Sequence, residues 1–165
     1  MTFPALNLLF PVVLAVHNMD EYSRYDEFVQ AYRGRIPQRF TTRRVMRNAL
    51  ILLTVTAGAI SVVTYFYRTE AFISLSRIAI LALLLNGGGH CFQSLIKRRF
   101  TPGTLSAATL VLPFSVAAII VMRSHMGDSI SSLLGFALAG AITIPMASAI
   151  FILLGYAVSQ IGNKA

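Results

Sequence analysis

Five long stretches of apolar sequence constrain what this chain can fold into. They cover residues 3–22, 49–66, 78–96, 105–122 and 131–156. A helix needs about 20 predominantly apolar residues to cross the hydrocarbon core of a bilayer, and each stretch approaches or exceeds that length. Only 12% of the residues are charged, whereas a soluble domain averages about 25%. The sequence therefore predicts an all-α integral membrane protein, a helical bundle of five transmembrane helices in a single domain, residues 1–165.

The polar segment between the first two stretches, residues 23–48, is expected to lie on the cytoplasmic surface of the membrane. Aromatic and apolar side chains recur around its first half at spacings of three and four, namely Tyr22, Tyr25, Phe28, Val29 and Tyr32. This spacing is typical of an amphipathic helix at an interface. Gly34 and Pro37 are expected to end that helix.

The distribution of Lys and Arg predicts the orientation. If residues 23–48 are cytoplasmic, five crossings place eleven basic residues inside: Arg24, Arg33, Arg35, Arg39, Arg43, Arg44, Arg47, Lys97, Arg98, Arg99 and Lys164. Three are then outside: Arg68, Arg77 and Arg123. Because cytoplasmic loops carry an excess of Lys and Arg, the N-terminus is predicted outside and the C-terminus in the cytoplasm.

The net charge of +8 does not indicate a nucleic-acid-binding protein. The basic residues crowd at the ends of the apolar stretches, where they orient a membrane protein. The sequence has no basic patch with interleaved aromatic residues. The same charges attract anionic lipid headgroups, so membrane lipids are the expected partners and nucleic acid is not.

A cluster of ionisable residues ends the first apolar stretch. His17 precedes Asp20 by three residues and Glu21 by four, so on a helix the three side chains share one face. Asn86 and His90 share a face of the third stretch in the same way. At 1.5 Å per residue, His17 lies about 8 Å and His90 about 9 Å from the cytoplasmic end of its stretch. The two faces are therefore expected to meet at one level of the cytoplasmic leaflet.

Charged side chains in this position need partners. An Asp, Lys or Arg deep in a spanning helix costs roughly 2.5–3.5 kcal/mol on insertion. We therefore expect Asp20 and Glu21 to face the bundle interior, paired with a cation, a protonated histidine or a metal ion. Arg24 lies on the same face as His17 and is expected to pair with one of the carboxylates and to contribute to substrate binding.

The residue types suit a divalent metal, because two imidazoles with one or two carboxylates bind Zn²⁺, Fe²⁺ or Mn²⁺. The expected ligands, which would also be the catalytic residues, are His17, Asp20, Glu21 and His90. Asn86 would be a weak oxygen ligand, an orienting residue or a substrate contact.

Two other interpretations use the same residues without a metal. In the first, His17 or His90 is a general base oriented by a neighbouring carboxylate. In the second, the first motif is an interfacial helix end and Asn86 and His90 form a hydrogen-bonded contact between helices. No Ser or Cys is visibly paired with a base for covalent catalysis.

Prolines and glycines mark places where the helices are expected to depart from regular geometry. Pro11 and Pro113 predict kinks. The run Gly87-Gly88-Gly89 predicts either close helix packing or a local opening that admits a ligand beside His90. The third histidine, His125, lies in a short outer turn and is expected to be solvated.

Three short patterns together resemble the HXXEE-motif membrane proteins: His17-x-x-Asp20-Glu21, Asn86-x-x-x-His90 and Phe100-Thr-Pro102-Gly103. That family is named for a His-x-x-Glu-Glu signature, which is accompanied by Asn-x-x-x-His. This chain has Asp20 where the family name has Glu, so a carboxylate is retained on a side chain one methylene shorter. The resemblance implies a five-span architecture and a candidate polar site.

The leading hypothesis is a small membrane-embedded enzyme, metal-dependent or acid–base, that acts on a lipophilic small-molecule substrate near the cytoplasmic leaflet. Hydrolysis, isomerisation and cyclisation are all compatible with the residues. One alternative is a cation or proton transporter, although the outer halves of the spans offer hydroxyl groups and no acidic residue for a relay. Another is an accessory protein whose polar network fixes the register of its helices.

Overall fold

The computed structural model describes residues 2–31 and 36–161, and every secondary-structure element in them is helical. Five segments are long and apolar enough to cross a membrane: Phe3–Ser23 (α1 and α2), Arg43–Tyr67 (α4), Glu70–Lys97 (α5), Thr104–Met126 (α6, η2 and α7) and Ile130–Ile161 (α8). Each contains one of the five predicted stretches. The all-α fold is confirmed, and it is compatible with a multi-pass membrane protein.

The first segment is interrupted in its first half. α1 (Phe3–Asn7) ends before Leu8, and α2 (Phe10–Ser23) begins after a short turn. Pro11 lies in the first turn of α2, where its missing N–H costs no hydrogen bond within the helix. The kink predicted at Pro11 is confirmed as a break between two helices.

The fourth segment contains a widened turn just before Pro113. It comprises α6 (Thr104–Ser106), the π-helical segment η2 (Ala107–Val111) and α7 (Leu112–Met126). The first amide of α7 bonds back to the first carbonyl of η2, five residues earlier. Proline has no amide hydrogen, and its ring presses against a carbonyl of the preceding turn, which favours such widening. The predicted kink takes this form.

The three consecutive glycines of α5 differ in what surrounds them. A Cβ atom on Gly87 would lie 2.8 Å from Cγ1 of Val111, so Gly87 allows α5 to pack closely against η2. Gly88 and Gly89 have no atom of another described element within 4 Å of the same position. Close packing therefore explains Gly87 alone, and open space lies beside the other two.

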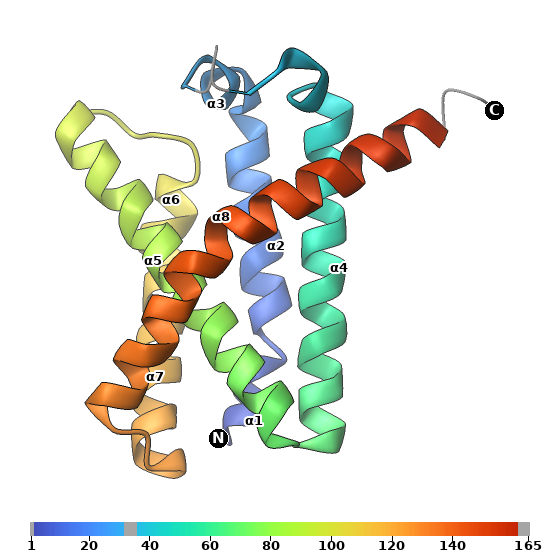
Figure 1. Cartoon of the computed structure of the whole chain (residues 1–165). Helices are drawn as coiled ribbons and strands as arrows, with labels where there is room; N and C mark the ends of the chain where they lie inside the picture. Colours follow the sequence, from blue (N-terminus) through green and yellow to red (C-terminus); the bar gives the residue numbers. More distant parts are fainter. Residues whose placement is uncertain (1, 32–35, 162–165) are drawn as a thin grey trace.

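α8 crosses α4 and α5 obliquely on the outside of the bundle (Figure 1). Two glycines permit the close approach. A Cβ atom on Gly155 would lie 2.5 Å from the carbonyl oxygen of Val45, and one on Gly140 would lie 2.9 Å from the backbone nitrogen of Ala82. Because most of its other residues are exposed, α8 braces two helices from outside and adds little to the interior.

The connection between α2 and α4 contains α3 (Tyr25–Ala31) and a 3-10 turn, η1 (Gln38–Phe40). The Tyr25 hydroxyl donates to the carbonyl of Thr41, which ties α3 to the chain just before α4. Burial raises the pKa of this hydroxyl, so it stays protonated as a donor. The predicted helix end at Gly34 falls in residues 32–35, outside the described part of the chain.

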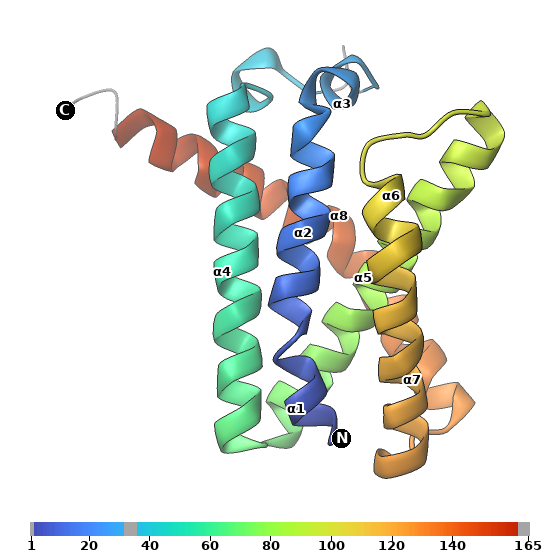
Figure 2. The same cartoon turned by 180° about the vertical axis from the view of Figure 1, so that it is seen from behind.

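The segments richest in Lys and Arg lie at one end of the bundle, which we call the basic end. The start of α4 and the end of α5 lie there, together with α3 and the end of α8, whereas α1 and the α4–α5 and α7–α8 turns lie at the other end (Figures 1 and 2). At that other end, Nε of Arg77 lies 3.0 Å from Oδ2 of Asp128, an ion pair that joins α5 to the α7–α8 turn. The fold thus segregates basic residues as the sequence predicts.

Candidate functional site

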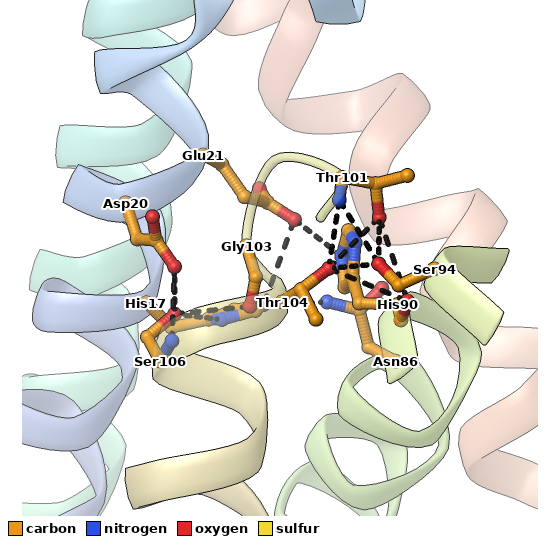
Figure 3. Close-up of polar contacts among 10 residues, drawn as sticks. All are labelled: His17, Asp20, Glu21, Asn86, His90, Ser94, Thr101, Gly103, Thr104 and Ser106. Atoms are coloured by element: carbon orange, nitrogen blue, oxygen red, sulfur yellow. Dashed lines mark hydrogen bonds and ion pairs between the residues drawn. The ribbon is translucent and has the colours of Figure 1, made fainter. Parts of the chain in front are cut away.

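Polar side chains from α2, α5 and the start of α6 converge on one another (Figure 3). Their centre is Glu21, whose Oε1 lies 2.7 Å from Nε2 of His90 and 3.5 Å from Nε2 of His17. The two imidazole rings meet edge to face, with their centroids 5.2 Å apart. The helical faces that carry the two histidines therefore meet, as their matched depths predict.

Burial differs among these three side chains. The His17 side chain is 1% exposed, whereas Glu21 and His90 keep 19% and 17% exposure. One nitrogen of each histidine and one oxygen of Glu21 all lie within 4.8 Å of one another, so these three residues could hold a metal ion. Three of the four predicted ligands thus form a compact group that is partly accessible.

Asn86 lies one helical turn before His90 and reaches the same group. Its Nδ2 lies 3.0 Å from Nε2 of His17. The amide therefore contacts the histidine nitrogen that faces Glu21 and His90. This places Asn86 beside the predicted ligands, in reach of anything they bind.

Asp20 points away from the group formed by His17, Glu21 and His90. Its Oδ2 accepts hydrogen bonds from the backbone N–H of Ser106 at 2.9 Å and from the Ser106 hydroxyl at 2.8 Å. Ser106 ends α6, so this carboxylate caps the N-terminus of the helix that continues into η2 and α7. A negative charge is stabilising there because of the free N–H groups and the helix dipole.

Arg24 does not pair with the motif carboxylates. Its guanidinium donates to both oxygens of Glu27, at 2.9 and 2.8 Å. The predicted pairing of Arg24 with Asp20 or Glu21 is therefore wrong. The reason is local, because Glu27 lies three residues ahead and offers a two-pronged contact on the same helical surface.

Ser106 is the residue that the sequence did not indicate. Its Oγ lies 2.9 Å from Nδ1 of His17, and the residue is 5% exposed. The sequence shows no Ser beside a base, whereas the fold brings Ser106 to His17. Eighty-nine residues separate the two, so no local motif reveals the contact; the nearest signal is the Thr101-Pro102-Gly103 turn that leads into the fourth stretch.

Gly103 closes the site from the α5–α6 loop. Its φ of +80° lies in the left-handed region that favours glycine. A Cβ atom there would lie 2.9 Å from Cγ of Glu21, 3.1 Å from Cε1 of His17 and 3.2 Å from Cε1 of His90. The backbone of Gly103 therefore packs directly against all three residues of the group.

Three hydroxyl groups hold this loop in place. The Ser94 hydroxyl lies 3.0 Å from that of Thr101 and 2.6 Å from that of Thr104, and it accepts the N–H of Thr101 at 2.9 Å. Thr101 and Thr104 are 6% and 4% exposed. This network fixes the start of α6 to the end of α5 and so positions Gly103.

Comparison with known protein families identifies the chain. Residues 8–118 match the family described as a protein of unknown function with HXXEE motif, which is more than half of the sequence. The chain belongs to the HXXEE family. No curated protein and no solved structure matches it.

The HXXEE match has a structural counterpart. It includes all the site residues, from His17 to Ser106, and ends within α7 before α8 begins. The Asn-x-x-x-His pattern supplies Asn86 and His90, which meet the motif that names the family. The site thus lies wholly within the matched part of this HXXEE protein, and the outer helix α8 lies beyond it.

Proposed function

We propose that this HXXEE protein is a membrane-embedded, metal-dependent enzyme that acts on a lipophilic small-molecule substrate. The observation that carries the proposal is the group of His17, Glu21 and His90, whose ligand atoms lie within 4.8 Å of one another. Ionisable side chains between apolar helices are costly, and such residues commonly mark functional sites. The partial exposure of Glu21 and His90 gives a substrate access.

The donor set favours a catalytic rather than a purely structural metal. Catalytic zinc sites use three protein ligands drawn from His and carboxylate side chains and keep a position open, and Fe²⁺ and Mn²⁺ accept the same donors. A metal held there acts as a Lewis acid toward a carbonyl or phosphoryl oxygen. Hydrolysis, isomerisation and cyclisation are reactions that this chemistry supports, with Asn86 orienting the substrate.

The surroundings favour a lipophilic substrate on the cytoplasmic side. The site lies between helices that are long and apolar enough to cross a membrane. It lies toward the basic end, where Lys97 ends α5 and Arg98 and Arg99 follow it. Because positive charge favours the cytoplasm, we assign the basic end and the C-terminus to the cytoplasm and the N-terminus to the outside.

A metal-free acid–base enzyme is the second candidate, and one contact favours it. The 2.7 Å distance between His90 Nε2 and Glu21 Oε1 is that of a charge-assisted hydrogen bond. A histidine held by a carboxylate in this way can act as a general base or acid. Metal analysis separates the two candidates.

The test is the metal content of detergent-purified protein, prepared without chelators and measured by elemental mass spectrometry. Wild type is compared with His17→Ala, His90→Ala and the matched control His125→Ala, whose histidine is exposed in α7. The proposal expects about one Zn, Fe or Mn per chain in wild type and in the control. Both site variants are expected to lose it while keeping a monodisperse gel-filtration peak and helical circular dichroism.

Two results would overturn the metal site. One is wild-type protein that holds no metal and acquires none on titration with Zn²⁺, Fe²⁺ or Mn²⁺. The other is a folded His90→Ala variant that binds metal as tightly as wild type does. In either case the acid–base candidate would replace the metal-dependent one.

A further inference from the structure

The two carboxylates of the motif face different partners. Glu21 contacts both histidines of the site. Asp20 contacts Ser106 through one oxygen, Oδ2, and Ser106 in turn contacts Nδ1 of His17. A chain of hydrogen bonds therefore runs from Asp20 through Ser106 to the side of the His17 ring that faces away from Glu21.

The direction of this chain follows from counting hydrogens. A carboxylate only accepts hydrogen bonds, and a serine hydroxyl has a single hydrogen to give. That hydrogen can point to Oδ2 of Asp20 at 2.8 Å or to the carbonyl oxygen of Gly103 at 3.1 Å, and both of these groups only accept. In either case the Ser106 oxygen can only accept from His17. His17 then carries its proton on Nδ1, which donates to Ser106 across 2.9 Å.

The contact on the opposite side of the ring fits the same tautomer. The Asn86 amide nitrogen, a donor without acceptor capacity, lies 3.0 Å from Nε2 of His17. With the amide in this orientation, Nε2 accepts the hydrogen bond and is unprotonated. Two partners on different helices thus agree on one tautomer, with the Nε2 lone pair directed toward the side where Glu21 and His90 lie.

We propose that Ser106 is a positioning residue that links the Asp20 carboxylate to His17 and holds the His17 ring in the Nδ1–H tautomer. The Nε2 lone pair then lies on the side of Asn86, Glu21 and His90. Asp20 is then no ligand but the anchor of this relay and the cap of α6. The Ser106 hydroxyl is buried and lies within hydrogen-bond distance of both Asp20 and His17, which suits this positioning role. Outer partners of this kind fix ligand histidines and raise their basicity in metal sites generally.

The tautomer can be tested on metal-free protein. The chain has three histidines, so nitrogen NMR of ¹⁵N-histidine-labelled protein in micelles with chelator can be assigned with single His variants. We expect neutral His17 to show a protonated Nδ1 and an unprotonated Nε2. Ser106→Ala should introduce the Nε2–H tautomer, because Nδ1–H loses its acceptor.

The control is Ser115→Ala, the same substitution on the same helical segment at a serine that is 0% exposed. Its His17 signals should match those of wild type. The proposal fails if wild-type His17 carries its proton on Nε2, if Ser106→Ala leaves the tautomer unchanged in folded protein, or if Ser115→Ala alters it equally.

A second measurement rests on the proposed function, because it uses metal affinity. Ser106→Ala should weaken the binding of Zn²⁺ or Co²⁺ by about 10- to 100-fold without removing the site. Asp20→Asn should weaken it less, because the amide oxygen still accepts from Ser106. If Asp20 acts through Ser106, the double variant should bind within about twofold of Ser106→Ala, as coupled residues do.

The two measurements test different proposals. Wild-type protein without metal affinity would overturn the proposed function, and the tautomer measurement would still test the relay from Asp20 through Ser106 to His17. Additive losses in the two single variants would instead show that Asp20 acts independently of Ser106, which would overturn the relay and leave the metal site in place.

Discussion

Two buried polar clusters in this molecule are built from different residue types. The histidine cluster, made of His17, Glu21 and His90, is ionisable and partly accessible. The amide–hydroxyl cluster, made of Asn7, Thr64 and Ser76, is neutral and at most 1% exposed. In it, Nδ2 of Asn7 donates to Ser76 at 3.1 Å, and the hydroxyls of Ser76 and Thr64 lie 2.9 Å apart.

The difference separates two uses of polarity between apolar helices. Neutral hydrogen bonds between helices give a modest gain, about 0.6 kcal/mol per contact on average in a membrane protein. In the amide–hydroxyl cluster, Oδ1 of Asn7 is buried without a partner among the described residues. Ionisable groups cost several times more free energy to bury than a neutral hydrogen bond gains. Partial exposure of such groups adds nothing to the stability of the fold. The amide–hydroxyl cluster therefore suits a role in helix register, and the histidine cluster suits chemistry.

The largest effect is expected from Glu21→Gln, which removes the charge shared by both histidines while keeping the side-chain size. Metal affinity should fall by more than about 100-fold, since even residues behind the ligands cost about 10- to 100-fold. Isothermal titration with Zn²⁺ measures it. The matched control is Glu27→Gln, which weakens the contact with Arg24 and should bind metal as wild type does. Equal losses in the two variants would show that the effect of Glu21→Gln is not specific to the site.

Gly103→Ala should come next, because it combines backbone strain with crowding of the histidine cluster. Gly127→Ala is its matched control, since Gly127 has a φ of +72° but no atom of another described element within 4 Å of an added Cβ. We expect about 1 kcal/mol of destabilisation for the control and about 2–4 kcal/mol, together with weakened metal binding, for Gly103→Ala. Unfolding by sodium dodecyl sulfate titration checks this; equal losses would show that Gly103 is needed only for its φ.

The five helices and the meeting of His17 with His90 could be predicted from the sequence, whereas the amide–hydroxyl cluster was not predicted. The five apolar stretches set the helices, because the length needed to cross a bilayer is a simple physical constant. Counting residues from the helix ends predicted that His17 and His90 lie at the same depth. Both predictions depend only on position along a helix axis.

The contacts of Asp20, Ser106 and Arg24 depend on how each helix is rotated about its own axis and on the path of the loops. No local sequence pattern specifies either. Asp20 and Glu21 are adjacent, so they point about 100° apart, and only the placement of α6 decides which one enters the site. The contact of Ser106 with His17 depends on the π-helical turn and on the Ser94 network that hold the start of α6. Arg24 pairs with Glu27. Sequence spacing alone does not show which of the neighbouring carboxylates it contacts.

Asn7→Leu probes the neutral cluster and should have a smaller effect. It removes one donor to Ser76, whose hydroxyl keeps Thr64 as a partner. The free energy of unfolding should fall by about 1 kcal/mol or less, and metal affinity should be unchanged. The same two assays apply. Loss of metal binding in folded Asn7→Leu protein would show that the two clusters act as one and would remove the distinction drawn between them.

Ser115→Ala should give the smallest change, and its sign is informative. The Ser115 hydroxyl is fully buried in α7 and has no hydrogen-bond partner among the described residues. Removing an unpaired buried hydroxyl relieves a desolvation cost without breaking a bond, so stability should stay level or rise by about 0.5 kcal/mol. Ser76→Ala, which breaks paired contacts, is the comparison and should lower stability in the same titration. If Ser115→Ala destabilised the protein as much as Ser76→Ala, hydrogen bonding would no longer explain why the neutral cluster is where it is.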